Sequence, residues 1–209
     1  MNNNTDGVKA KVLNVPNMLT ISRMFMIPVF IAFFYVHFTG HYFVALAVFI
    51  IASLTDLLDG MIARKYNLVT NLGKFLDPIA DKVLVLSAFA VFLTDPQIFY
   101  INSGVWEIIV AGCGVAVILA REIIVSGFRM VAADSGYVIA ADMVGKYKTV
   151  TQDASIIVLL IGAGVCAVTK SSAGDIIRYI GLALFALAVV LTVISGLNYI
   201  IKNIQVLKQ

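Results

Sequence analysis

The sequence predicts an all-α integral membrane protein with six transmembrane helices, and two observations lead to this prediction. First, 61% of the 209 residues are hydrophobic and only 13% are charged, fewer charges than the surface of a soluble domain carries. Second, the chain contains a series of largely apolar stretches of roughly 20 residues, the length that spans the hydrocarbon core of a bilayer. Helices are expected because their backbone N–H and C=O groups form hydrogen bonds within the helix, as lipid requires. No stretch shows the alternation of apolar and polar residues that is typical of a barrel strand.

In chain order, the apolar stretches are 18–38, 42–63, 75–94, 105–128, 149–168 and 176–201. Segments that contain glycine or proline separate them, such as TGHY, TDPQIFYINSG, ADSGYVIAADMVGK and SSAGD. No linker or internal repeat divides the chain, so one six-helix domain is expected over residues 16–209. Residues 1–15 are polar and lack the apolar core and cleavage site of a signal peptide, so a short cytoplasmic lead-in is expected there.

Lysine and arginine residues are distributed unevenly between the two ends of the predicted helices. Of the 15 in the chain, only Lys170 and Arg178 fall on the side opposite the N-terminus, which leaves 13 on the N-terminal side. Basic residues concentrate on the cytoplasmic side of a membrane. We therefore expect a multi-pass protein of the cell (cytoplasmic) membrane with both termini in the cytoplasm. The net charge of +3 is too small to indicate a nucleic-acid partner, so none is expected.

Four aspartates gather near the cytoplasmic ends of the second and third predicted helices. Asp56 and Asp59 are three residues apart and share a helix face, and Asp77 and Asp81, four apart, share another. The connection between the two pairs is long enough for the chain to turn back beside the second helix. The two aspartate pairs can therefore lie at the same depth in the membrane. Carboxylates so close together repel one another, and hard oxygen ligands of this kind suit Mg²⁺ or Mn²⁺. The sequence therefore predicts a metal site that faces the cytoplasm.

The residues between these acids suit a ligand that carries phosphate. Gly60 and Ala63 lie on the face of the first aspartate pair, where small side chains let a ligand approach the backbone. Arg64 offers a planar donor fork for phosphate, and Gly73 allows a turn or close approach before the third helix. Taken singly, an Asp-x-x-Asp pair is commonly a solvated helix cap, and small residues often serve helix packing. The complete spacing is far more specific.

The whole pattern, Asp-x2-Asp-Gly-x2-Ala-Arg-x8-Gly-x3-Asp-x3-Asp over residues 56–81, resembles the signature of the CDP-alcohol phosphotransferase family at every fixed position. The resemblance implies a six-helix membrane enzyme, a homodimer, in which the hydroxyl of an alcohol displaces CMP from a CDP-linked lipid or alcohol. It implies that Asp56, Asp59 and Asp77 bind a pair of divalent metal ions, and that Asp81 is both a metal neighbour and the general base. It further implies that the CDP group is held at Gly60, Ala63, Arg64, Thr70 and Gly73.

A second set of cations bears on the acceptor alcohol. Arg121 and Glu122 interrupt an otherwise apolar helix, which calls for a functional reason, and Arg129 lies two turns further on the same face as Arg121. Lys146 and Lys148 directly precede the fifth predicted helix. If these cations converge, they suit an acceptor that already carries a phosphate. The alternative is that they anchor the helices at the cytoplasmic interface, with a contact between Arg121 and its neighbour.

Three fragments, REIIVSGFR, GKYKT and NVPNMLTISRMFMIP, resemble the phosphatidylglycerophosphate synthase branch of the family. This resemblance implies CDP-diacylglycerol as donor and sn-glycerol 3-phosphate as acceptor. Asn17, Thr20 and Arg23 recur at helical spacing at the entry of the first helix. Asn17 and Thr20 are candidates for contacts with the CDP-lipid and Arg23 for the acceptor phosphate, although a helix cap and interfacial anchoring explain all three about as well.

Two other functions remain open at this point. A family member that uses inositol phosphate, serine or a lipid alcohol would show the same aspartate pattern. A transporter coupled to ions or protons could use the aspartates as a relay, but the acids lie at one edge and the halves of the chain show no repeat.

Overall fold

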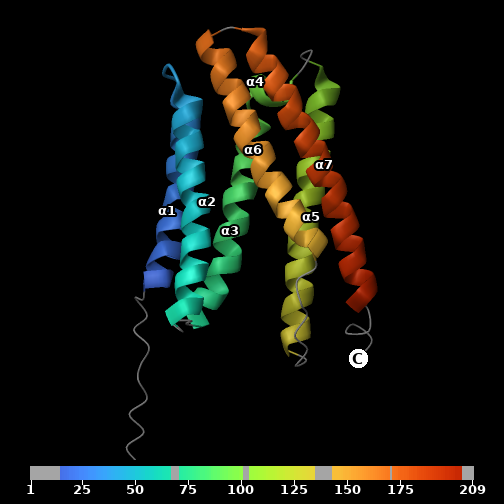
Figure 1. The fold of residues 1–209 in the computed structure, drawn as a ribbon. Coiled ribbons are helices and arrows are strands. Elements are labelled where there is room, and N and C mark those ends of the chain that lie inside the picture. Colours follow the sequence, from blue (N-terminus) through green and yellow to red (C-terminus); the bar gives the residue numbers. More distant parts are fainter. Residues whose placement is uncertain (1–14, 67–70, 101–103, 135–142, 170, 204–209) are drawn as a thin grey trace, which may run out of the picture.

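The computed structural model describes residues 15–66, 71–100, 104–134, 143–169 and 171–203, and within these ranges every regular element is a helix. These elements are six long helices and one short one, and Figure 1 shows their arrangement. They are α1 (Val15–Tyr35), α2 (His41–Tyr66), α3 (Asn71–Phe92), α4 (Pro96–Phe99), α5 (Val105–Asp134), α6 (Met143–Thr169) and α7 (Ser172–Asn203). The all-α prediction is confirmed for the described part of the chain, and each expected helix coincides with one of the six long helices.

Among the described residues, four helices are long and apolar enough to cross a membrane: α1, α5, α6 and α7. The qualifying stretches are Met18–Tyr35, Val105–Met130, Met143–Thr169 and Ser172–Asn203. The apolar parts of α2 and α3, His41–Thr55 and Lys82–Phe92, are shorter than a full span. The chain is thus a multi-pass membrane protein, whereas a count of six spans stays a prediction for α2 and α3.

Helices α3 and α6 begin earlier than the apolar pattern predicts. Helix α6 begins at Met143, so Lys146 and Lys148 lie inside its first two turns and not ahead of it. Helix α3 begins at Asn71, so Gly73 lies in its first turn and not in a preceding bend. Both expectations were wrong for the same reason: a helix continues through polar residues wherever these have water or protein partners.

The short helix α4 was not predicted, because the segment around it contains the turn-forming residues Asp95 and Pro96. The Asp95 side chain accepts a hydrogen bond from the Gln97 backbone N–H at 2.8 Å, and Pro96 stands at the first helical position. Ile98 and Phe99 then become buried in the bundle. Arg178 of α7 donates to the Gln97 carbonyl at 3.0 Å and so joins α4 to α7.

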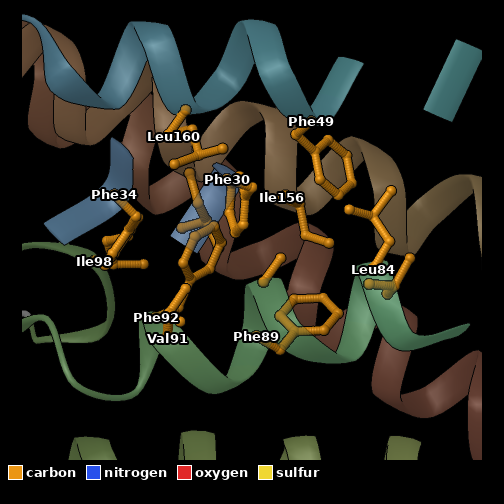
Figure 2. Close-up of a cluster of buried hydrophobic side chains, with 14 of the residues drawn as sticks. Phe30, Phe34, Phe49, Leu84, Phe89, Val91, Phe92, Ile98, Ile156 and Leu160 are labelled. Atoms are coloured by element: carbon orange, nitrogen blue, oxygen red, sulfur yellow. The ribbon is translucent and has the colours of Figure 1, made fainter. Parts of the chain in front are cut away.

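Buried aromatic side chains fill the half of the bundle nearest α4 (Figure 2). The rings of Phe34 and Phe92 lie 5.7 Å apart, and those of Phe89 and Phe185 lie 5.2 Å apart. Such offset and tilted pairs add to the free energy gained by burying the rings. This packing makes the α4 end of the bundle an apolar core.

Helices α6 and α7 approach each other closely along most of their length. The approach depends on Gly162 in α6, where a Cβ atom would lie 2.8 Å from the backbone nitrogen of Arg178 in α7. A similar conflict would arise at Gly181, where a Cβ atom would lie 2.8 Å from the Leu159 side chain. Small residues permit such close contact between membrane helices.

Candidate active site

Apart from Thr70, the predicted site residues belong to helix segments toward one end of the bundle, the end where α1 begins and α7 ends (Figure 1). This end also holds the last turns of α2, the first turns of α3 and α6, and the last turns of α5. The up-and-down course of the helices brings these segments together, although they are far apart in the sequence. The α4 end, by contrast, is filled by the aromatic core.

The four aspartates lie on two neighbouring helices. Asp56 and Asp59 belong to α2, Asp77 and Asp81 belong to α3, and only residues 67–70 separate the two helices. Helices α2 and α3 are in contact. The donor set, four carboxylates on two adjacent helices, fits the chemistry of divalent metal ions. Among the side chains that the structure describes, no group of three or more His, Cys, Asp or Glu could hold a metal ion.

Several predicted contacts lie outside the described residues. These comprise Thr70 as a whole, the surroundings of Gly60 and Gly73, and the side chains of Asn17, Asp56, Asp59, Ala63, Arg64, Asp77 and Asp81. The metal and CDP contacts assigned to these residues therefore stay predictions.

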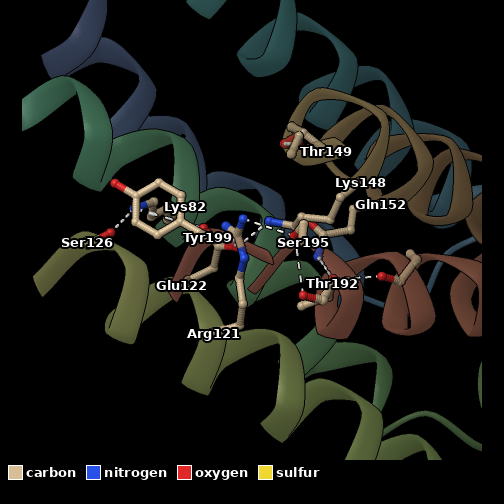
Figure 3. A network of polar contacts seen from close by, with 12 residues as sticks. Lys82, Arg121, Glu122, Ser126, Lys148, Thr149, Gln152, Thr192, Ser195 and Tyr199 are labelled. Atoms are coloured by element: carbon tan, nitrogen blue, oxygen red, sulfur yellow. Dashed lines mark hydrogen bonds and ion pairs between the residues drawn. The ribbon is translucent and has the colours of Figure 1, made fainter. Parts of the chain in front are cut away.

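Glu122 of α5 is the centre of a buried cluster of charges (Figure 3). Its Oε1 accepts hydrogen bonds from the ammonium of Lys148 in α6 and from Nη1 of Arg121 at 3.2 Å. Its Oε2 lies 3.9 Å from Nζ of Lys82 in α3, and Lys82 also donates to the hydroxyl of Ser126. The side chains of Lys148 and Glu122 are only 4% and 9% exposed. One carboxylate thus holds cations from three helices.

Helix α7 supports this cluster from the other side. Nη2 of Arg121 donates to the hydroxyl of Ser195 at 3.0 Å. Gly196 leaves room for the arginine stem, since a Cβ atom there would lie 3.0 Å from Cγ of Arg121. One turn further along, the guanidinium of Arg129 lies over the ring of Tyr199 and donates to its hydroxyl at 3.3 Å. Arg121 and Arg129 therefore point toward the same helix, as their spacing predicts.

A small cavity lies beside the cluster, between α3, α5 and α6. Its polar lining consists of Lys82, Glu122, Lys148, Thr149 and Gln152, and apolar side chains of α3 and α5 complete the wall. The cavity has a volume of about 30 Å³, enough for about two water molecules. The amide of Gln152 is fixed by a hydrogen bond to Thr192 of α7 at 3.4 Å. Charged and neutral hydrogen-bonding groups thus face one water-sized space.

The predicted acceptor residues have different positions. Arg121 and Lys148 meet at Glu122, and Arg129 lies on Tyr199. Lys146 is exposed on α6 and does not line the cavity. Thr20 and Arg23 of α1 are buried, with relative exposures of 3% and 0%. Neither side chain lines the cavity beside Glu122, so the roles expected for Thr20 and Arg23 stay predictions.

Sequence reasoning missed Lys82, Gln152, Ser195 and Tyr199 as parts of the site. Lys82 directly follows Asp81 but contributed only to the count of basic residues. Gln152 and Ser195 are uncharged polar residues within apolar helices, a signal that could have identified them.

Known proteins are similar to this chain over nearly its whole length. A family model described as CDP-alcohol phosphatidyltransferase matches residues 13–194. The CDP-diacylglycerol–glycerol-3-phosphate 3-phosphatidyltransferase of Bacillus subtilis (strain 168) is 36% identical over 209 residues, covering 94% of this chain and 98% of the relative. The protein of the same name from Escherichia coli (strain K12) is 36% identical over 189 residues, covering 90% and 93%. A third, from Rickettsia typhi, is 36% identical over 186 residues, covering 89% and 94%.

Proposed function

The chain belongs to the CDP-alcohol phosphatidyltransferase family, and we propose that it transfers the phosphatidyl group of CDP-diacylglycerol to sn-glycerol 3-phosphate. The products are phosphatidylglycerophosphate and CMP. The relatives that match nearly the whole chain carry the name of this activity. The proposal makes the protein an enzyme of phospholipid synthesis.

The observation that supports this acceptor is the buried cluster of Lys82, Arg121 and Lys148. An acceptor that already carries a phosphate presents an anion that such cations can bind through charge-assisted hydrogen bonds. Serine lacks a phosphate and a lipid alcohol carries none at its hydroxyl end, so neither needs a cluster of three cations. Inositol phosphate shares the anionic group, and the names of the relatives favour glycerol 3-phosphate over it.

The aspartates on α2 and α3 supply the chemistry of transfer in this proposal. Two divalent ions, Mg²⁺ or Mn²⁺, held by Asp56, Asp59, Asp77 and Asp81, would neutralise the charge of the CDP pyrophosphate and of the departing CMP. Asp81 takes the proton from the acceptor hydroxyl as this oxygen bonds to the β-phosphorus, and the bond from that phosphorus to CMP breaks.

The remaining predicted contacts position the donor. Gly60, Ala63, Arg64, Thr70 and Gly73 are the proposed contacts of the CDP group, and Asn17 and Thr20 those of the lipid headgroup. Arg23, Arg129 and Lys146 are proposed to assist the acceptor phosphate. We also propose that both termini and the active site face the cytoplasm and that the enzyme works as a homodimer.

The decisive experiment measures CMP release by the purified protein in detergent with CDP-diacylglycerol and Mg²⁺ or Mn²⁺. Glycerol 3-phosphate, inositol phosphate and serine are compared as acceptors, and a sample with a metal chelator serves as control. We expect release that requires both glycerol 3-phosphate and the metal ion. If no acceptor led to CMP release, the proposed activity would be overturned. Release of CMP with inositol phosphate alone would change only the proposed acceptor.

Replacement of Arg121 by alanine is expected to raise the KM for glycerol 3-phosphate by about tenfold or more. The change removes a charge-assisted hydrogen bond worth about 1.5–3 kcal/mol, and the KM for CDP-diacylglycerol should change by less than about twofold. Arg178→Ala is the matched control, because Arg178 also joins two helices but lies at the α4 end. Equal increases for both substrates in Arg121→Ala would indicate a purely structural role.

A further inference from the structure

Gln152 of α6 is a buried, uncharged side chain in the wall of the cavity, and the proposed function gives it no task. Its relative exposure is only 2%. A buried polar group without a hydrogen-bond partner costs free energy, so an amide at this position needs a reason. The directions in which the two ends of the amide point supply one.

The hydrogen bonds of Thr192 in α7 determine how the Gln152 amide is oriented (Figure 3). The Thr192 hydroxyl donates its single proton to the Ala188 carbonyl at 2.6 Å. The Thr192 oxygen can therefore only accept, and it accepts from Nε2 of Gln152 at 3.4 Å. The nitrogen end of the amide thus faces α7. In the part of the chain that the structure describes, no group donates to the carbonyl oxygen at the other end of the amide.

Thr149 presents a second oxygen of the same kind. It lies one turn before Gln152 on the same face of α6. Its hydroxyl donates to the Gly145 carbonyl at 3.2 Å, which leaves the Thr149 oxygen to accept. Both side chains line the cavity. A phosphate oxygen is mainly an acceptor and does not suit this uncharged part of the wall, whereas a hydroxyl that donates its proton does.

Glycerol 3-phosphate, the acceptor in the proposed function, carries two hydroxyls. The primary hydroxyl at the terminal carbon is the less hindered nucleophile, which leaves the secondary hydroxyl at the middle carbon for recognition. A hydroxyl has the size of one water molecule, so it fits a cavity of about 30 Å³. The cavity also lies beside the turn of α3 that carries the predicted base, because Lys82 in its wall directly follows Asp81.

On the basis of the proposed function, we propose that Gln152 is a specificity-determining residue that recognises the middle hydroxyl of glycerol 3-phosphate. Its carbonyl oxygen accepts the proton of this hydroxyl, and Thr192 holds the amide in the orientation that allows it. Lys148, a predicted phosphate contact, lies four residues before Gln152, a spacing that places Cβ atoms about 5–6 Å apart on one helix face. In the acceptor, only the ester oxygen and two carbons separate the phosphorus from the middle hydroxyl. One face of α6 can therefore meet both groups.

The test compares glycerol 3-phosphate with 3-hydroxypropyl phosphate, which keeps the phosphate and the primary hydroxyl but lacks the middle hydroxyl. CMP release by the purified protein with CDP-diacylglycerol and the metal ion gives kcat/KM for each acceptor. We expect the wild type to prefer glycerol 3-phosphate by about tenfold or more, because the analogue leaves a buried acceptor oxygen unsatisfied. In Gln152→Leu, which keeps much of the bulk but removes the carbonyl, the preference should fall below about threefold.

Two variants of Thr192 test the orientation of the amide without a change in the cavity wall. Thr192→Val removes the oxygen that accepts from Nε2, so the amide can turn, and the preference should fall between those of the wild type and Gln152→Leu. Thr192→Ser keeps this oxygen and should keep the preference. Ser155→Ala is the matched control, because Ser155 is a buried polar residue of α6 that does not line the cavity. Its preference should equal that of the wild type.

The ratio of the two kcat/KM values does not depend on how much of a variant folds, so a lost preference reports recognition and not stability. Equal use of both acceptors by the wild type, or full preference in Gln152→Leu, would overturn the role of Gln152 and leave the proposed function intact. The cavity would then hold water only. If Gln152→Leu does not fold, equal preference in Thr192→Val and Thr192→Ser would overturn the role instead. CMP release that depends on neither acceptor would overturn the proposed function as well.

Discussion

Replacement of Asp81 by asparagine is expected to lower kcat for CMP release by about a thousandfold. A positioned general base contributes about 10²- to 10⁴-fold to such a reaction, and asparagine cannot accept the proton of the acceptor hydroxyl. The donor should still bind, because Asp56, Asp59 and Asp77 remain. Turnover can be followed by CMP release, and donor binding by protection of the protein against thermal unfolding.

Asp175→Asn provides the control for this change. Asp175 is an aspartate at the α4 end, where it pairs with Arg178 at 3.0 Å, and it lies far along the chain from the aspartates of α2 and α3. Its replacement should leave kcat within about twofold of the wild type. Full turnover in Asp81→Asn would remove Asp81 as the base and would leave its carboxylate a role in metal binding at most.

Replacement of Gly162 by alanine is expected to lower the free energy of unfolding by about 3 kcal/mol. The added Cβ atom would lie 2.8 Å from the backbone nitrogen and 3.0 Å from the Cα atom of Arg178. A backbone cannot rotate away as a side chain can, so the cost lies at the upper end of the range for overpacking. In a protein of this size the midpoint of thermal unfolding should fall by about 6–12 °C, measured in detergent.

Gly112→Ala is the matched control, because a Cβ atom at Gly112 of α5 would meet no atom within 4 Å. Alanine is the better helix former by roughly 1 kcal/mol, so this variant should be as stable as the wild type or slightly more stable. Equal losses in Gly162→Ala and Gly112→Ala would show that the close approach of α6 and α7 does not limit stability.

The sequence predicts the helices well because the membrane imposes a simple rule on length and composition. Apolar runs of about 20 residues identify the positions of all six long helices. The rule fails where polar residues have partners, and so it misses the early starts of α3 and α6. It also misses α4, whose four residues are fixed by the Asp95 cap and by the burial of Phe99.

Part of the candidate site can likewise be predicted from the sequence, and part of it depends on how the helices pack. The aspartate pattern can be predicted from spacing within each helix. Asp56 and Asp59 share one face of α2, and Asp77 and Asp81 share one face of α3. The cluster around Glu122 is not local: Lys82 and Lys148 are separated by more than 60 residues, and Ser195 reaches Arg121 from another helix. Only the packing of α3, α5, α6 and α7 determines which cations share the carboxylate.

The contrast between the two ends of the bundle has a consequence for the growth of the membrane. The charged cluster and the aspartate-bearing turns lie at one end, while aromatic rings and α4 fill the other. Under the proposed function, each molecule of phosphatidylglycerophosphate that the enzyme makes is therefore released into the leaflet next to the charged end. The opposite leaflet would receive these lipids only by movement across the bilayer, so the enzyme would create an asymmetry that other processes must relieve.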